Sequence, residues 1–299
     1  MSTYAPKYYK DFKCTAENCP HNCCLGWRVS LDERTKALYD KARGGYSDQL
    51  RAHIARDCDG YYIPQTAGAR CPHLDEKGLC RVISIYGDGY LSDICREHPR
   101  YYNNVENRLE VGLGASCPEA ARLIIERQCS LDIEKISENG GDDVDNCRYS
   151  SFKLRERITK ILHNHACYVD AEDELIREFA LPPDIVTPKF RIDVLADLEY
   201  LYPEDRGIIF DAAAKATDGT SKDLFKVSSY FIYRHMATAE SENEAIAILG
   251  FSVFSTRIVE AMSKLVGNMS EALRIFSEEI EYSTENTERI IFDIENAMI

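Results

Sequence analysis

The sequence predicts a mainly α protein in which an irregular, cysteine-rich N-terminal part packs on a helical C-terminal part. Eight of the twelve cysteines are clustered between positions 14 and 117, where the solitary Cys58 also lies, in a segment rich in turn-forming residues and with little sustained periodicity. Beyond position 147, apolar residues recur at helical spacing, as at Leu154, Ile158, Ile161 and Leu162. With 299 residues, 44% of them hydrophobic, the chain can bury a sizeable core without cross-links.

The N-terminal part contains one clear helical signal and one weak strand signal. Ser30-Leu-Asp-Glu33 has the capping-box pattern, and it predicts a helix through about Arg43 with Leu31, Leu38 and Tyr39 on its buried face. A short hairpin is expected near Arg108–Leu113, and strand signals are otherwise nearly absent.

The C-terminal part is expected to be separate. The polar, acidic segment 138–146 predicts a linker, which divides the chain into a cysteine-rich region, 1–137, and a helical region, 147–299. Apolar periodicity in that second region predicts five helices, at Ser151–His165, Leu224–Met236, Glu244–Leu265, Ser270–Ile280 and Glu285–Met298.

Composition restricts the compartment and the partners. The N-terminus has no apolar run typical of a secretory signal, and no stretch approaches about 20 uninterrupted apolar residues. These features predict a cytoplasmic protein with no membrane partner. Structural disulfides rarely persist in a reducing compartment, so clustered cysteines there indicate metal or redox chemistry. The net charge of −14 argues against a nucleic-acid partner, because phosphates require a basic face.

The clustered cysteines are the candidate metal ligands. Thiolates two to four residues apart can converge on a metal, although an adjacent pair cannot readily bond one metal atom. Zinc usually takes four thiolates from regular paired knuckles, whereas these spacings are irregular and the thiolates number eight. We therefore favour a [4Fe–4S] cluster, with zinc as the alternative and buried free thiols as the non-functional interpretation. The spacing leaves open which four of the candidates bind: Cys14, Cys19, Cys23, Cys24, Cys71, Cys80, Cys95 and Cys117.

Several residues beside these cysteines have more than one interpretation. His21, His73 and His98 each lie within three residues of a cysteine. Each could be a metal ligand or a hydrogen-bond donor to sulfur, but at such positions an exposed loop residue is the more frequent case. Trp27 is expected to shield the metal. Gly112-Leu-Gly114 is interpreted as a turn that delivers Cys117 rather than as a nucleotide-binding site, because no α/β alternation surrounds it.

Five ordered motifs resemble the flagellin lysine-N-methylase family, within a broader cysteine-rich family described as zinc- or iron-chelating. They cover about a hundred residues: Tyr9-x2-Phe12-x-Cys14; Cys19-x3-Cys23-Cys24-x-Gly26-Trp27; Cys71-Pro72-x5-Gly78-Leu79-Cys80; Leu91-Ser92-x2-Cys95-x3-Pro99-Arg100; and Ser116-Cys117-Pro118-Glu119-Ala120-Ala121.

This resemblance implies N-methylation of flagellin lysines with S-adenosylmethionine and an iron–sulfur centre. The Cys-x3-Cys-x2-Cys motif of radical S-adenosylmethionine enzymes is absent, because Gly26 occupies the position of its third cysteine. The residues that catalyse the reaction or bind the methyl donor are not assigned. The rival hypothesis is a non-enzymatic module that binds zinc or iron for a redox or structural purpose.

Overall fold

The computed structural model describes residues 2–106, 108–127, 132–138, 149–216 and 221–298. The chain forms two compact units. Met1–Phe12 and Arg100–Ile299 form the first, here called the helical unit, and Lys13–Pro99 forms the second, here called the cysteine unit. The expected linker lies outside the described residues apart from Glu138, so the division into 1–137 and 147–299 stays a prediction.

The helical unit contains a four-stranded sheet that was not expected. Its strands, in spatial order, are β5 (Arg100–Val105), β6 (Arg108–Leu113), β1 (Ser2–Pro6) and β7 (Ile133–Glu138). Strand β1 is parallel to β6 and antiparallel to β7. Only the β5–β6 hairpin was foreseen, and the near absence of strands was a wrong prediction. The missed strand β1 pairs with residues about a hundred positions away, so no local turn marks it.

Helices dominate the rest of the helical unit and confirm the mainly α prediction. The five predicted helices match α6, α10, α11, α12 and α13 within a few residues, except that α12 ends early and continues as the π-helical turn η6. The helical segments are α5 (Pro118–Arg127), α6 (Phe152–Asn164), α7 (Tyr168–Glu178), η4 (Pro188–Phe190), α8 (Ile192–Ala196), α9 (Pro203–Lys215), α10 (Leu224–His235), η5 (Met236–Thr238), α11 (Glu242–Val266), α12 (Met269–Phe276), η6 (Ser277–Glu281) and α13 (Thr284–Ala297), after the 3-10 turn η1 (Lys7–Asp11).

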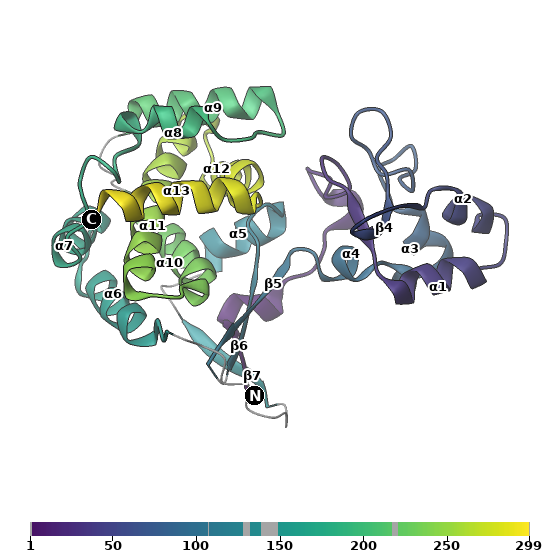
Figure 1. Ribbon diagram of the computed structural model, residues 1–299, viewed down its shortest axis with the longest axis horizontal. Coiled ribbons are helices and arrows are strands. Elements are labelled where there is room, and N and C mark those ends of the chain that lie inside the picture. The colour runs from purple at the N-terminus through teal and green to yellow at the C-terminus, as the bar shows by residue number, and fades with distance from the viewer. Residues whose placement is uncertain (1, 107, 128–131, 139–148, 217–220, 299) are drawn as a thin grey trace. The chain divides into compact units, whose positions relative to one another are not determined.

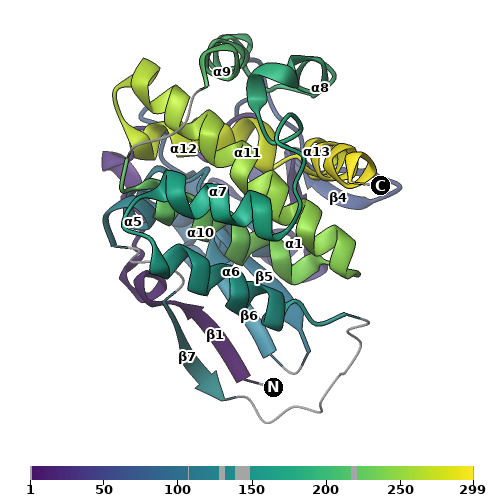
Figure 2. The same cartoon turned by 90° about the vertical axis from the view of Figure 1, so that its left-hand side faces the viewer.

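Helix α11 is the central element of this unit. The Ser241 side chain caps its start by accepting a hydrogen bond from the backbone N–H of Glu244, and Gly267 ends it in the left-handed conformation. Helices α9, α10, α12 and α13 pack around it (Figures 1 and 2). By length and composition α11 could cross a membrane, but 89% of its apolar window is buried inside the protein, which is the pattern of a core helix.

A buried ion pair joins α6 to the sheet. The Arg155 guanidinium donates to both carboxylate oxygens of Glu110 on β6, at 2.7 and 2.5 Å. Their side chains are only 6% and 0% exposed. Two charges buried this deeply are tolerated only because each satisfies the other. The pair therefore fixes the position of α6 over the sheet.

The cysteine unit is small and is built on short elements. Its three-stranded sheet has the order β2 (Val29–Leu31), β4 (Gly60–Ile63), β3 (Ala55–Asp57). Its helical segments are η2 (Ala16–Asn18), α1 (Glu33–Lys41), α2 (Ser47–Ala52), α3 (Arg81–Tyr86), η3 (Asp88–Tyr90) and α4 (Asp93–Glu97).

The start of α1 differs from the predicted capping box. Ser30 lies in β2, and Asp32 is the N-cap, with its Oδ1 accepting from the Thr35 backbone N–H at 2.8 Å. The other oxygen of Asp32 accepts from the backbone N–H of Asp93 at 2.8 Å. One carboxylate therefore begins α1 and also ties it to α4, the helix that carries Cys95.

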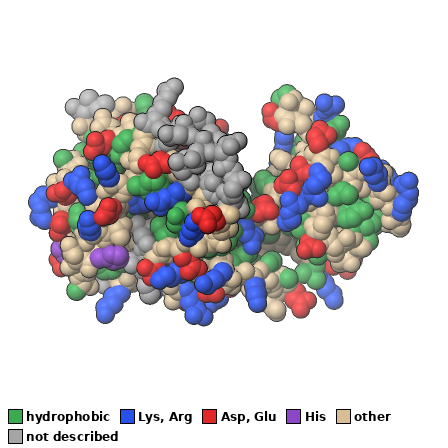
Figure 3. Space-filling model, turned by 90° about the horizontal axis from the view of Figure 1, so that it is seen from below, with side chains coloured by type: hydrophobic (Ala, Val, Ile, Leu, Met, Phe, Trp, Pro, Cys, Tyr) green, Lys and Arg blue, Asp and Glu red, His purple; other side chains and the backbone are tan. Residues whose placement is uncertain are grey.

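The surface is mixed in charge on the face shown in Figure 3. Lysine and arginine side chains lie among aspartate and glutamate side chains on each unit. Although the chain has a net charge of −14, the acidic side chains on this face do not form one continuous patch.

Candidate functional site

Five of the eight candidate ligands gather in the cysteine unit. The thiol of Cys23 is hydrogen-bonded to that of Cys24, and both lie within electrostatic range of Cys71. Cys80 and Cys95 complete the group. Each lies within electrostatic range of Cys23, and Cys95 also lies within electrostatic range of Cys71 and Cys80. These five residues are called the thiol cluster below.

Backbone pairing brings the first half of the thiol cluster to Cys71. Cys71 donates its backbone N–H to the carbonyl of Cys24 at 2.9 Å, and Gly26 donates to the carbonyl of Ala69 at 2.9 Å. Gly26 has a φ of 84°, a conformation that suits glycine. Two segments about 45 residues apart in the sequence are therefore joined by backbone hydrogen bonds at the cysteines themselves.

A tight turn then returns the chain to Cys80. The Asp75 carboxylate accepts from the backbone N–H groups of Lys77 and Leu79 at 2.9 and 2.8 Å. Gly78 occupies the left-handed region with a φ of 79°. The turn places Cys80 opposite Leu74 and at the N-terminus of α3.

The thiols lie against an apolar cluster that includes Val29, Leu31 and Tyr39. Burial raises the pKa of Cys71 and of Cys80, and it raises the pKa of Cys95 to about 12. The hydrogen bond between the adjacent thiols lowers the pKa of Cys23 to about 7 and raises that of Cys24. Soft sulfur donors are concentrated here in a low-dielectric setting.

His73 lies beside the thiol cluster and is buried, so the interpretation as an exposed loop residue is wrong for it. Its ring is 1% exposed, and its Nδ1 is 3.0 Å from the Tyr46 hydroxyl. Its Nε2 is buried and has no partner among the described residues. Burial lowers the pKa of His73 to about 4, so the ring is neutral near pH 7. Trp27, expected to shield the metal, donates its Nε1–H to the carbonyl of Cys23 at 2.6 Å.

The other three candidate ligands are not among these five residues. Cys14 is exposed, Cys19 is half-buried, and the two flank η2. Cys117 belongs to the helical unit, where it precedes α5 and packs against that unit's core. The eight-residue ligand set itself stays a prediction.

The spacing of the thiols bears on which metal group they fit. A single zinc ion with four thiolates at about 2.3 Å holds the sulfurs about 3.8 Å apart. Among the residues that the structure describes, only Asp57, Cys58 and Asp59 place three potential ligand atoms within 4.8 Å of one another. The thiol cluster is therefore wider than a compact single-ion site.

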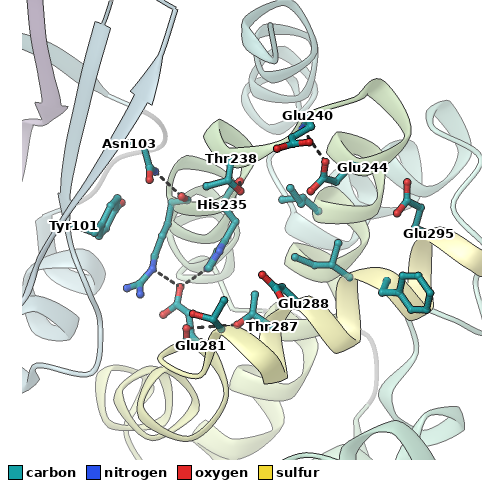
Figure 4. A pocket seen from close by; sticks show the side chains of 15 residues that line it. Tyr101, Asn103, His235, Thr238, Glu240, Glu244, Glu281, Thr287, Glu288 and Glu295 are labelled. Carbon is teal, nitrogen blue, oxygen red and sulfur yellow. Dashed lines mark hydrogen bonds and ion pairs between the residues drawn. The ribbon is translucent and has the colours of Figure 1, made fainter. Parts of the chain in front are cut away.

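A second feature, a pocket of about 580 Å³, lies within the helical unit (Figure 4). Residues of β5, the end of α10, η5, the first turns of α11, η6 and α13 line it. Glu244 of α11 and Glu288 of α13 extend from its two walls.

A buried polar network forms the floor of this pocket. Glu281 is fully buried, and its Oε1 lies 2.7 Å from His235 Nε2 and 3.3 Å from Arg234 Nε. Its Oε2 accepts from the hydroxyl groups of Tyr230 at 2.7 Å and Ser277 at 2.5 Å. Burial alone would raise the pKa of Glu281, but Arg234 and these hydrogen bonds outweigh it and lower the pKa to about 2. Burial also lowers the pKa of His235, which is therefore neutral near pH 7.

The π-helical turn η6 positions that network. Such turns often mark functional sites because they displace side chains from the regular helical rows. Sequence reasoning missed this pocket, because β5, α10 and η6 are far apart along the chain. The Arg234-His235 pair, two ionisable residues in the last turn of a largely apolar helix, was the signal that could have indicated it.

The chain was compared with known proteins. No family profile and no solved structure matches it. It is 30% identical over 131 residues to the flagellar biosynthetic protein FliU of Salmonella muenchen, a match that covers 40% of this chain and 75% of FliU. It is equally similar, over 131 residues, to the lysine-N-methylases of Salmonella choleraesuis and Salmonella typhimurium, but there it covers only 31% of their length.

The extent of the FliU match establishes the relationship, and it agrees with the ordered cysteine motifs. The chain belongs to the family of FliU and the flagellin lysine-N-methylases.

Proposed function

We propose that this protein is a cytoplasmic protein-lysine N-methyltransferase that acts on flagellin, with S-adenosylmethionine as methyl donor and a [4Fe–4S] cluster held by cysteines. The observation that carries the proposal is the convergence of five thiols in a chain of the flagellin lysine-N-methylase family; Cys71 is buried, and Cys24, Cys80 and Cys95 are half-buried. The names of two relatives support the reaction, and the name of FliU supports the flagellar substrate.

The cluster fits the residues of the cysteine unit. We assign three of its ligands to Cys71, Cys80 and Cys95, and the fourth to one member of the adjacent pair Cys23 and Cys24. An adjacent pair cannot readily bond one metal atom, so the second thiol remains as a hydrogen-bond donor to sulfur. Cys71 belongs to an apolar cluster, and Cys24, Cys80 and Cys95 pack against it.

The transfer itself is a displacement at carbon. The neutral ε-amine of lysine attacks the methyl group on the sulfonium, an N–C bond forms, the S–C bond breaks, and S-adenosylhomocysteine and a proton leave. The protein must therefore hold a lysine side chain and allow its proton to depart.

The direct test is methyl transfer by protein purified without oxygen. Flagellin is incubated with this protein and methyl-labelled S-adenosylmethionine, and modified lysines are identified by mass spectrometry. The Cys71→Ser, Cys95→Ser double variant is expected to lose transfer, while Cys58→Ser, at an exposed thiol of the cysteine unit outside the thiol cluster, retains it. The absence of labelled lysine with cluster-loaded wild-type protein contradicts the proposal.

One observation favours a second candidate, a metal-binding module without methyltransferase activity. The chain matches only 31% of the length of the named lysine-N-methylases. Such a module binds no S-adenosylmethionine in calorimetry, and removal of its metal unfolds the cysteine unit. Measurable binding of S-adenosylmethionine excludes this candidate.

A further inference from the structure

The pocket of the helical unit carries negative charge that the protein does not neutralise. Among the described lining residues, the basic side chain is that of Arg234, and it forms an ion pair with buried Glu281. The neutral ring of His235 is hydrogen-bonded to the same carboxylate. Four other lining carboxylates, those of Glu240, Glu244, Glu288 and Glu295, form no ion pair with any lysine or arginine in the described part of the chain. A cation entering the pocket therefore meets unpaired carboxylates above a fixed polar floor.

The geometry of the walls suits a long side chain with a charged end. Glu244 and Glu288 come from α11 and α13, on opposite walls (Figure 4). One oxygen of Glu244 accepts from the backbone N–H of Glu240 at 2.7 Å, which fixes that carboxylate in place. Between these groups the wall is apolar, with Ile248 and Ile291, and the Phe292 ring is 58% exposed.

These features match a lysyl side chain better than a simple metal cation. Four methylene groups pack on isoleucine and phenylalanine surfaces, and the ammonium group pairs with carboxylates and with an aromatic face. A hard metal ion gains nothing from an apolar wall. An anionic ligand is repelled, because the guanidinium of Arg234 is already engaged with Glu281 and the tyrosines around it.

We propose that this pocket receives the lysine side chain of the protein substrate, with Glu244 and Glu288 as the residues that bind its ammonium group. The inference rests on the proposed function for the identity of the substrate, but the binding can be measured without methyl transfer. Glu281 and His235 act as positioning residues, since they fix the floor of the pocket from within the core.

The test uses the full chain with its isoleucine methyl groups labelled for NMR. Nα-acetyl-lysine N-methylamide is the probe, and the norleucine analogue, which lacks the charge, is its control. We expect the lysine probe to shift the methyl signals of Ile248 and Ile291 in a saturable way that weakens as salt is added, and the norleucine probe to leave them unchanged.

Matched variants identify the carboxylates. The Glu244→Gln, Glu288→Gln double variant is expected to weaken the binding of the lysine probe about tenfold, from two partly exposed ionic contacts. Glu285→Gln makes the same chemical change on the first turn of α13, outside the pocket lining, and is expected to bind as the wild type does. Equal binding of both probes, signal changes confined to other isoleucines, or equal effects of the double variant and Glu285→Gln overturn the proposal.

The outcome also separates this inference from the proposed function. Saturable binding at Ile248 and Ile291 without methyl transfer to flagellin supports the pocket and contradicts the methyltransferase. Methyl transfer that is unchanged in the double variant supports the methyltransferase and contradicts the pocket.

Discussion

Replacement of Glu281 by glutamine is expected to destabilise the helical unit in a pH-dependent way. The variant removes the negative charge that faces Arg234 and His235, while it keeps the size of the side chain. Arg234, whose side chain is only 14% exposed, is then left as a buried charge without its carboxylate partner. Removal of one member of a buried pair usually costs about 3–5 kcal/mol.

The pKa of Glu281 supplies a second estimate of the same quantity. That pKa is lowered from 4.5 to about 2, because Arg234 and the hydrogen bonds outweigh burial. The lowered pKa corresponds to about 3 kcal/mol of stability at pH 7. A depressed folded-state pKa means that this stability is present above pH 4.5 and is lost as the pH falls towards 2. The difference in free energy of unfolding between the wild type and Glu281→Gln should therefore fall to about 2 kcal/mol at pH 3.5.

Urea unfolding followed by circular dichroism measures both values. Wild type, Glu281→Gln and the exposed control Glu285→Gln are compared at pH 7 and pH 3.5. The double variant Glu281→Gln, Arg234→Met should recover part of the lost stability, since it leaves no unpaired buried charge. A loss below 1 kcal/mol at pH 7, or an identical loss at both pH values, would refute the reasoning.

Three further substitutions test other parts of the structure. Glu110→Gln should lower the free energy of unfolding by about 3–5 kcal/mol, because it leaves the buried Arg155 unpaired, and Glu110→Gln with Arg155→Met should cost clearly less in the same urea assay. Gly112→Ala places a Cβ 2.2 Å from the Tyr101 hydroxyl, so the Tyr101 ring must move. We expect the free energy of unfolding to fall by about 1–3 kcal/mol and the near-ultraviolet circular dichroism spectrum to change. An unchanged melting temperature contradicts the close approach. Asp32→Ala removes the N-cap of α1 and its link to α4, for an expected loss of about 1–2 kcal/mol. Asp32→Asn should restore only part of this loss in thermal unfolding, because its single acceptor oxygen can keep the cap but not the bond to Asp93 as well.

The sequence predicted the elements whose signals are local. Helix α11 was recognisable because one long apolar periodic run is bounded by a serine and a glycine. Strand β1 was not, because its five residues become a strand only by pairing with β6. Helix α1 was placed correctly but with the wrong cap, since Ser30 pairs with Tyr62 in the sheet instead of capping the helix.

The same distinction applies to the two candidate sites. The cysteines are rare residues with chemical meaning, so their clustering was visible in the sequence, but the contact of Cys24 with Cys71 needed the fold. The pocket residues are common types from six separate elements. Nothing in the spacing of Glu244 and Glu288 links them, and only the packing of α13 on α11 brings them to one hollow.

The central claim is that the thiol cluster holds iron and sulfide. The most direct measurement is the metal content and visible absorption of the full chain purified without oxygen, for the wild type and for Cys58→Ser and Cys71→Ser, Cys95→Ser variants. The account predicts equal amounts of iron and sulfide in the wild type and in Cys58→Ser, with broad brown absorption bleached by dithionite, and their loss in the double variant. A colourless wild-type protein with stoichiometric zinc, or iron retained by the double variant, would contradict it.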